Sequence, residues 1–175
     1  AGDNNWTYTN SDMMDGVTVM LHFQPSHTTG DVKSSTEYGI KYTGIEGLDV
    51  GFAAGDNESA AAVVENTVMY AKYAIDAFTI GVQDNSTDSE TANADNDFRA
   101  YGISYAINDD MSISYNLAKT EYENSSLEDQ EATGMSFSYT NGSMTFSGSM
   151  NEVDNIQGAS ATDNTGYELN ISFAF

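Results

Sequence analysis

The side chains that could do chemistry in this sequence are few, and they form no catalytic motif. Ser, His and Asp are all present, but neither G-x-S-x-G nor H-E-x-x-H occurs, so we predict no catalytic residue. His22 and His27 are five residues apart and are expected on different elements, which argues against a metal pair. A hydrolase whose triad is assembled from distant strands leaves no local motif and stays open as an alternative.

The acidic stretch DNSTDSETANADND, residues 84–97, carries oxygen ligands of the kind that bind Ca²⁺. It lacks the glycine and the terminal glutamate of an EF-hand loop at their required spacing. A solvated acidic connection is therefore the favoured interpretation. The weak calcium candidates in this stretch are Asp84, Asp88, Asp95 and Asp97. We predict no other cofactor.

The net charge of the chain indicates which kinds of partner it can bind. The 175 residues include 27 Asp and Glu but only 5 Lys and Arg, which gives a formal net charge of -22. Nucleic acid is excluded as a partner, because phosphate binding needs a basic surface and the basic residues here are scattered singly. Cations are favoured instead. The absence of Cys removes disulfide and thiolate chemistry. The length allows one domain, residues 1–175.

The elements that must position these side chains are strands. In the last ten residues, GYELNISFAF, apolar side chains alternate with small or polar ones. Because strand side chains alternate between faces, this segment has one wholly apolar face. That face carries Tyr167, Leu169, Ile171, Phe173 and Phe175. The same period-2 pattern recurs along the whole chain, and we find no convincing amphipathic helix.

Eleven strand-like runs can be distinguished between clusters of Gly, Asn, Asp and Ser. They cover residues 5–9, 16–24, 36–43, 48–55, 67–74, 77–84, 98–107, 111–123, 130–139, 143–151 and 166–175. The connections between them alternate between tight and long. In an up-and-down antiparallel meander, alternate connections lie at the same rim, so one rim is predicted to carry tight turns and the other long loops.

The faces of these runs favour a transmembrane β-barrel over a soluble β-sandwich. Acids gather in the connections, whereas the polar face of the runs is mostly Ser, Thr, Gly and Asn. A soluble sheet usually carries Lys, Glu and Arg on its solvent face, so the apolar face here is expected to contact lipid. Only a closed barrel satisfies strand hydrogen bonds in lipid. Trp6, Tyr8, Tyr38, Tyr42, Tyr73 and Tyr139 fall near run ends, where interfacial aromatic residues belong.

Four stretches carry a family resemblance. NNWTYTNSDMMDGVTVMLHF resembles a short aromatic strand followed by a periplasmic turn and a Gly-led strand, and YAIDAFTIGV and YAINDDMSISY resemble tight periplasmic turns. GYELNISFAF is similar to the terminal strand that is read by the barrel assembly machinery. Together they resemble the general diffusion porins of Gram-negative outer membranes, closest in style to the alphaproteobacterial type. The resemblance covers nearly the whole chain.

The resemblance implies a water-filled channel for passive diffusion of small hydrophilic solutes, with a periplasmic C-terminus and no enzymatic activity. It also implies a homotrimer in contact with outer-membrane lipid and lipopolysaccharide, to which Ca²⁺ at the acidic loops could bridge. The acidic rim predicts a preference for cations. The pore-lining candidates, chosen by strand parity, are His22, Lys41, Asp49, Lys72, Gln83, Asn116, Glu168 and Asn170. Lys41 and Lys72 could act as the basic wall residues of the family, although its usual Arg cluster is missing.

The number of runs raises a question of completeness. If the C-terminus is periplasmic, an odd number of strands begins the chain on the extracellular side, whereas bacterial barrels have an even number. One interpretation is that these runs are the later strands of a barrel of about sixteen strands, with the rest and the constriction loop upstream. The alternative is a complete barrel of ten strands that starts at Gly16, with residues 1–15 as an extension. Such a small barrel could be an adhesin or a hydrolase.

Overall fold

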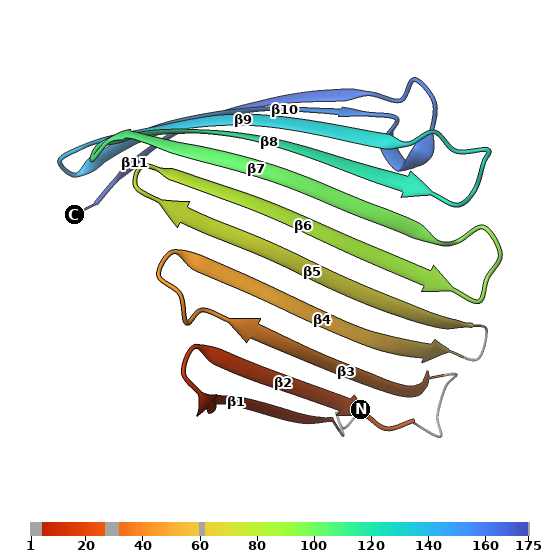
Figure 1. The fold of residues 1–175 in the computed structure, drawn as a ribbon. Helices are drawn as coiled ribbons and strands as arrows, with labels where there is room; N and C mark the ends of the chain where they lie inside the picture. Colours follow the sequence, from red (N-terminus) through yellow and green to blue (C-terminus); the bar gives the residue numbers. More distant parts are fainter. Residues whose placement is uncertain (1–4, 27–31, 60–61, 175) are drawn as a thin grey trace.

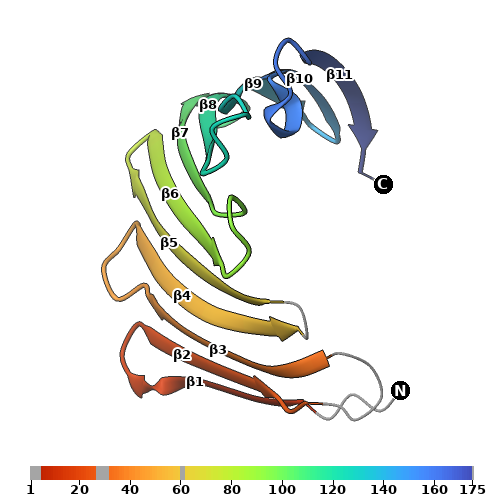
Figure 2. The ribbon, with the colours of Figure 1, turned by 90° about the vertical axis from the view of Figure 1, so that its right-hand side faces the viewer.

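In the computed structural model, residues 5–26, 32–59 and 62–174 are described, and they form one antiparallel sheet of 11 strands. Each strand pairs with the next in sequence, as an up-and-down meander requires; Figure 1 shows β1 to β10 in this order, and Figure 2 shows β11 beside β10. The strands are β1 (Trp6–Met14), β2 (Val17–Gln24), β3 (Val32–Tyr42), β4 (Leu48–Ser59), β5 (Val63–Ile75), β6 (Phe78–Ser89), β7 (Asn96–Asn108), β8 (Met111–Tyr122), β9 (Gln130–Asn141), β10 (Met144–Asp154) and β11 (Asn164–Phe173).

The two rims of the sheet differ as the alternating connections predict. The turns that join β1 to β2, β5 to β6, β7 to β8 and β9 to β10 are tight, and they lie at one rim together with the β3–β4 connection (Figure 1). Gly16 and Gly142 adopt positive φ angles of 71° and 60° in two of these turns, a conformation that glycine adopts readily. The connections after β2, β6, β8 and β10 are longer and lie at the opposite rim, together with the short connection between the end of β4 at Ser59 and the start of β5 at Val63. We call these the tight-turn rim and the long-loop rim.

Several strands extend further toward the long-loop rim than their apolar pattern predicts. β5 begins at Val63 rather than at residue 67, and β6 continues to Ser89 rather than ending at residue 84. The placement of Asp88 and Asp97 in a connection is therefore wrong, since Asp88 lies in β6 and Asp97 in β7, whereas Asp84 lies in β6 as the run 77–84 predicts. The backbone ladder continues past the point where the side chains become polar, with Glu65 paired to Asp88. The apolar pattern therefore indicates only the part of each strand that has an apolar face, and the hydrogen-bonded pairing continues beyond that part.

The sheet is a single layer. Among the described residues, no hydrophobic side chain is buried, so there is no second sheet and no core between sheets. The β-sandwich alternative is therefore wrong. The sheet curves into an open arc in which β1 and β11 do not meet (Figure 2). The ten-stranded alternative is wrong in treating residues 1–15 as an extension, because Trp6–Met14 forms β1 and pairs with β2.

Strand register separates the side chains into two faces across β2 to β11, apart from register shifts at the start of β3 and at the end of β7. Val19, Ile40 and Phe52 are cross-strand neighbours on the apolar face, and Ser104, Ser114 and Ser136 are neighbours on the polar face. Along β7 the apolar-face residues are mostly exposed and the polar-face residues are half-buried. Side chains converge on the inside of a curve, so this difference places the polar face on the concave side.

On several neighbouring strands, the residues of the apolar face change from apolar to charged at about the same height. On β8 this face runs from Met111 to Leu117, a rise of about 20 Å, and then continues with Lys119 and Glu121. β6, β7 and β9 likewise change from apolar to charged residues toward the long-loop rim. An apolar band of this height is comparable to the band of about 25 Å on transmembrane barrels.

The helical content of the described residues is one short 3₁₀ turn, Ile156–Gly158, in the connection before β11. None of the described segments forms a helix long and apolar enough to cross a membrane. Two residues named from the sequence, His27 and Phe175, lie outside the described residues.

Candidate functional site

The polar face brings some of the predicted pore-lining residues together and leaves others apart. All eight candidates lie on this face by register, from His22 on β2 to Glu168 and Asn170 on β11. Lys41, Asp49 and Lys72, from β3, β4 and β5, form one cluster. Because cross-strand neighbours on antiparallel strands face the same side, the register is what brings them together.

Asp49 is the centre of this cluster. Its Oδ2 atom lies 3.1 Å from the Lys41 ammonium group and 3.9 Å from that of Lys72. Its Oδ1 atom accepts a hydrogen bond of 2.9 Å from the hydroxyl group of Tyr70. The Asp49 side chain is 21% exposed, against 40% for Lys41 and 55% for Lys72. One carboxylate thus accepts a hydrogen bond from Tyr70 and pairs with two lysines, and the cluster keeps a net positive charge.

Tyr70 is the member of the cluster that sequence reasoning missed. It pairs with Gly51 on the polar face, and its ring lies over that glycine: a Cβ atom at Gly51 would come within 2.4 Å of the ring. The missing side chain at Gly51 lets the ring cross β4 and reach Asp49. The available signal was a tyrosine with polar-face parity in β5, opposite a glycine in β4.

Four of the remaining candidates have local partners on the polar face. The His22 ring nitrogen Nδ1 lies 2.8 Å from the Thr7 hydroxyl group, and the Asn170 amide donates to Glu168 at 2.8 Å. The Gln83 amide donates to Asn85 at 3.0 Å on its own strand. None of these groups joins the Asp49 cluster, and they do not form a second constellation with the spacing that catalysis requires.

The charge of the polar face is small compared with the charge of the chain. The charged side chains placed on it by strand pairing, in the described residues, are two lysines and three carboxylates. They are Glu37, Lys41, Asp49, Lys72 and Glu168. Most other acids of the strands lie on the apolar face near the long-loop rim, and many of the rest lie in connections. The net charge of the polar face is therefore close to zero.

Arg99 and Lys119 lie side by side on the apolar face, beyond its apolar band. Arg99 pairs with Asp84 at 2.7 Å, and Lys119 pairs with Glu121 and Asp129 at 2.9 Å each. These contacts tie neighbouring strands and a connection together at the long-loop rim. They contribute little to the charge of the polar face.

The calcium candidates are not brought together. Asp84 is paired with Arg99, and the Asp88 carboxylate accepts a hydrogen bond from Ser86. The Asp95 carboxylate accepts the backbone N–H of Ser89 within the connection. Across the part of the chain that the structure describes, no group of three or more His, Cys, Asp or Glu side chains is arranged to hold a metal ion.

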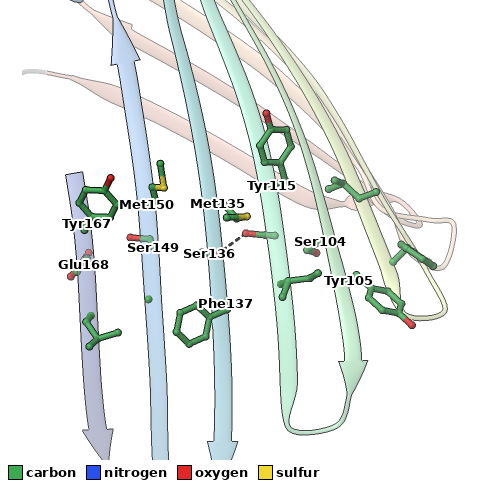
Figure 3. Close-up of a pocket in the computed structure, with 16 residues that line it drawn as sticks. Ser104, Tyr105, Tyr115, Met135, Ser136, Phe137, Ser149, Met150, Tyr167 and Glu168 are labelled. Carbon is green, nitrogen blue, oxygen red and sulfur yellow. Dashed lines mark hydrogen bonds between the residues drawn. The ribbon is translucent and has the colours of Figure 1, made fainter. Parts of the chain in front are cut away.

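A recess in the described structure belongs mainly to the apolar face. Its volume is about 780 Å³, and Figure 3 shows contributions from successive strands, including Tyr115, Phe137 and Tyr167. Serines of the opposite face also border it, among them Ser114 and Ser136, which are hydrogen-bonded at 2.7 Å. Most of its lining is apolar, so it offers a surface for hydrocarbon and no set of converging polar groups for a reaction.

The residues of the predicted assembly signal lie at the edge of the sheet. Tyr167, Leu169, Ile171 and Phe173 follow one another along the apolar face of β11, with exposed fractions of 57–76%. These are among the most exposed large apolar side chains of the structure, because β11 has a neighbouring strand on one side only.

Comparison with known proteins identifies the family. The family described as Gram-negative porin matches residues 65–175, which is more than half of the chain. The chain therefore belongs to the Gram-negative porin family. Comparison with curated proteins gave no match.

Solved structures confirm the fold. The anion-selective porin from Comamonas acidovorans matches with a TM-score of 0.79 at 12% identity, over 98% of this chain and 59% of that one. OmpF of Salmonella typhi, in complex with daunomycin, matches with a TM-score of 0.73 at 13% identity, over 96% of this chain and 61% of that one. The NanC porin gives a TM-score of 0.56 at 9% identity, over 98% of both chains. The chain thus spans about three fifths of the first two structures, and its sheet is part of a porin β-barrel.

Proposed function

We propose that this chain forms much of the wall of an outer-membrane channel through which small hydrophilic solutes diffuse passively, without reaction. The observation that carries the proposal is a single curved sheet with one apolar face and one polar, concave face, and no buried core among the described residues. Such a sheet is stable only if hydrocarbon covers the apolar side and water fills the other. The family supports the same function.

Selection in this proposal combines size exclusion with electrostatics. The acids near the long-loop rim attract cations over a Debye length of about 8 Å at physiological salt. We therefore propose a modest preference for cations. A structural neighbour is titled an anion-selective porin, so family membership alone does not decide the sign of the preference. The nearly neutral wall supports a weak preference rather than a strict one.

We propose that further strands close the barrel. In a meander of 11 strands, β1 and β11 run in the same direction, so direct closure would create a parallel pair. An odd number of additional strands keeps every pair antiparallel, and about five upstream strands with a constriction loop would complete a barrel of about sixteen. The similarity to NanC over nearly the whole of both chains favours, as a second candidate, closure by a smaller number of strands.

Orientation and partners follow from the same proposal. The tight-turn rim, with the C-terminal end of β11, would face the periplasm, and the long-loop rim would face outward toward lipopolysaccharide. The alternate apolar residues of β11 would serve as the signal that the barrel assembly machinery reads. We also propose a homotrimer, on the strength of the family resemblance.

Conductance measurements in planar bilayers test the proposed channel. The full-length protein, reconstituted in planar bilayers, is expected to give stepwise, ohmic conductance and a reversal potential that favours cations in a KCl gradient. A heat-unfolded sample is the control and should give no steps. A protein that stays monodisperse in buffer without detergent would contradict the membrane-spanning barrel. Turnover of lipid or peptide by a non-conducting protein would instead support the hydrolase alternative.

A further inference from the structure

The two lysines of the Asp49 cluster are not equivalent. The Lys41 ammonium group lies 3.1 Å from the carboxylate and that of Lys72 lies 3.9 Å from the same oxygen atom. The other carboxylate oxygen is already engaged by Tyr70. Asp49 therefore holds Lys41 closely and Lys72 loosely. Lys72, whose side chain is 55% exposed against 40% for Lys41, is the more accessible cation of the cluster.

A gap in the side chains of the wall lies beside Lys72. In the cross-strand row that contains Lys72, the next two positions are Gly81 on β6 and Gly102 on β7. A Cβ atom at Gly102 would meet nothing within 4 Å, and one at Gly81 would meet only a backbone oxygen at 3.8 Å. We call these two residues the glycine gap. At the usual strand spacing, the gap extends about 10 Å from Lys72 along the wall.

Packing does not explain the glycine gap. Gly51 and Gly55, on the neighbouring strand β4, lie beneath the side chains of Tyr70 and Glu37, where a Cβ atom would come within 2.7 Å or less. The side chain of Asn116, which borders the gap on β8, approaches Gly134 on the far side instead. Glycine weakens a strand interior, and it often marks a place where a ligand approaches the backbone closely. Here the open space faces the polar side of the sheet.

Hydrogen-bonding groups border the gap along the strands. Thr79 and Ser104 are paired with each other one step toward the tight-turn rim, and Gln83 lies one step toward the long-loop rim. Apart from Asp49, the nearest carboxylate that strand pairing places on the polar face here is Glu37. Glu37 lies in the same cross-strand row as Asn66, which is six residues from Lys72 along β5, so the separation is about 20 Å. The surroundings therefore combine one accessible cation, hydroxyl groups and open backbone, with no competing acid except Asp49.

We propose that Lys72 and the glycine gap form a subsite for small hydroxylated monocarboxylates. The carboxylate of the solute pairs with the Lys72 ammonium group, and its hydroxyl groups lie over Gly81 and Gly102 within reach of Thr79 and Ser104. This subsite deepens the proposed channel function and rests on it. The subsite binds organic anions that have entered the lumen, whereas the acidic rim attracts cations and repels anions before they enter.

The test compares two solutes that differ mainly in one group, gluconate and sorbitol. The full-length protein is reconstituted in liposomes with valinomycin, so that potassium crosses freely and the swelling rate in potassium gluconate reports entry of the anion. Swelling in sorbitol reports the width of the same pore. The quantity compared is the ratio of the gluconate rate to the sorbitol rate.

Lys72→Gln is expected to lower this ratio about fivefold, the effect of one charge at close range in water, while the sorbitol rate stays unchanged. Lys119→Gln removes the same charge from the apolar face and should leave the ratio as in the wild type. An unchanged ratio in Lys72→Gln with normal sorbitol entry, or an equal fall in Lys119→Gln, would overturn the subsite and leave the channel standing. If neither solute enters liposomes containing the wild-type protein, the channel function itself has failed.

Discussion

Gly51 and Gly102 offer a matched test of how the Asp49 cluster is built. Both are polar-face glycines in strand interiors, where replacement by Ala normally adds about 0.5–1 kcal/mol of stability. A Cβ atom at Gly51 would lie 2.4 Å from the ring of Tyr70, whereas one at Gly102 meets nothing within 4 Å. Carbon atoms need about 3.5 Å, so Gly51→Ala must displace the ring by about 1 Å.

That displacement reaches the hydrogen bond. The Tyr70 hydroxyl group lies 2.9 Å from Asp49, and a shift of about 1 Å would carry it beyond hydrogen-bonding distance. We therefore expect Gly102→Ala to raise the free energy of unfolding by about 0.5–1 kcal/mol, and Gly51→Ala to give no gain or a loss. In a Tyr70→Ala background the obstacle is gone, and Gly51→Ala should then stabilise as Gly102→Ala does.

The measurement is equilibrium unfolding by urea of the full-length protein in lipid vesicles, followed by the electrophoretic shift between folded and unfolded forms. A double-mutant cycle over Gly51 and Tyr70 isolates the coupling between them. Equal stabilisation by Gly51→Ala and Gly102→Ala in the wild-type background would refute the placement of the Tyr70 ring over β4. Additivity within about 0.3–0.5 kcal/mol would refute it independently.

Three further predictions address charge, face and rim. Asp49→Asn leaves both lysines without a carboxylate, so the ratio of K⁺ to Cl⁻ permeability should fall about twofold to fivefold at 0.1 M KCl. At 1 M KCl, where the Debye length is about 3 Å, the ratio should hardly change. A fall of equal size at both salt concentrations would contradict this electrostatic cause. Tyr115→Arg places a charge on the apolar face and should cost about 2–4 kcal/mol of unfolding free energy, whereas Asn116→Arg, one residue further on the polar face, should be tolerated. Glu65 lies directly between Asp56 and Asp88 across two strand pairs, so Glu65→Gln should stabilise by about 0.2–1 kcal/mol in the same unfolding assay; destabilisation would indicate a cation bound there.

The fold could be predicted from the sequence because the alternation of side chains is a local property. Each run carries its own two faces, and the alternating connection lengths fix the order of the strands without any long-range information. The residues that end the chain illustrate this: the alternate residues from Tyr167 to Phe173 lie on the apolar face of β11, as their parity predicts. Arg99 likewise has the parity of the apolar face, and it lies on that face near the long-loop rim.

The strand ends and the site geometry could not be predicted in the same way. A residue such as Asp88 looks like part of a loop by composition, but its backbone is paired with Glu65. Likewise, the parity of Lys41, Asp49 and Lys72 gives their face but not their contact, which depends on register between three strands. Tyr70 enters the cluster only because Gly51, on another strand, leaves room for its ring. Contacts of this kind depend on pairs of positions that no single strand reveals.

The charge of the chain and the charge of its wall are separate quantities. The formal charge of -22 resides mainly in connections and in the charged level above the apolar band, where water and counterions screen it. Among the described residues, strand pairing places two lysines and three carboxylates on the polar face, and both lysines lie within 4 Å of Asp49. In the channel that we propose, an ion or solute would therefore be selected by a few residues of one cluster rather than by the net charge of the chain. A single substitution such as Asp49→Asn should consequently change selectivity more than the removal of several acids from the long-loop rim, which alters the approach of ions but not the wall that they pass.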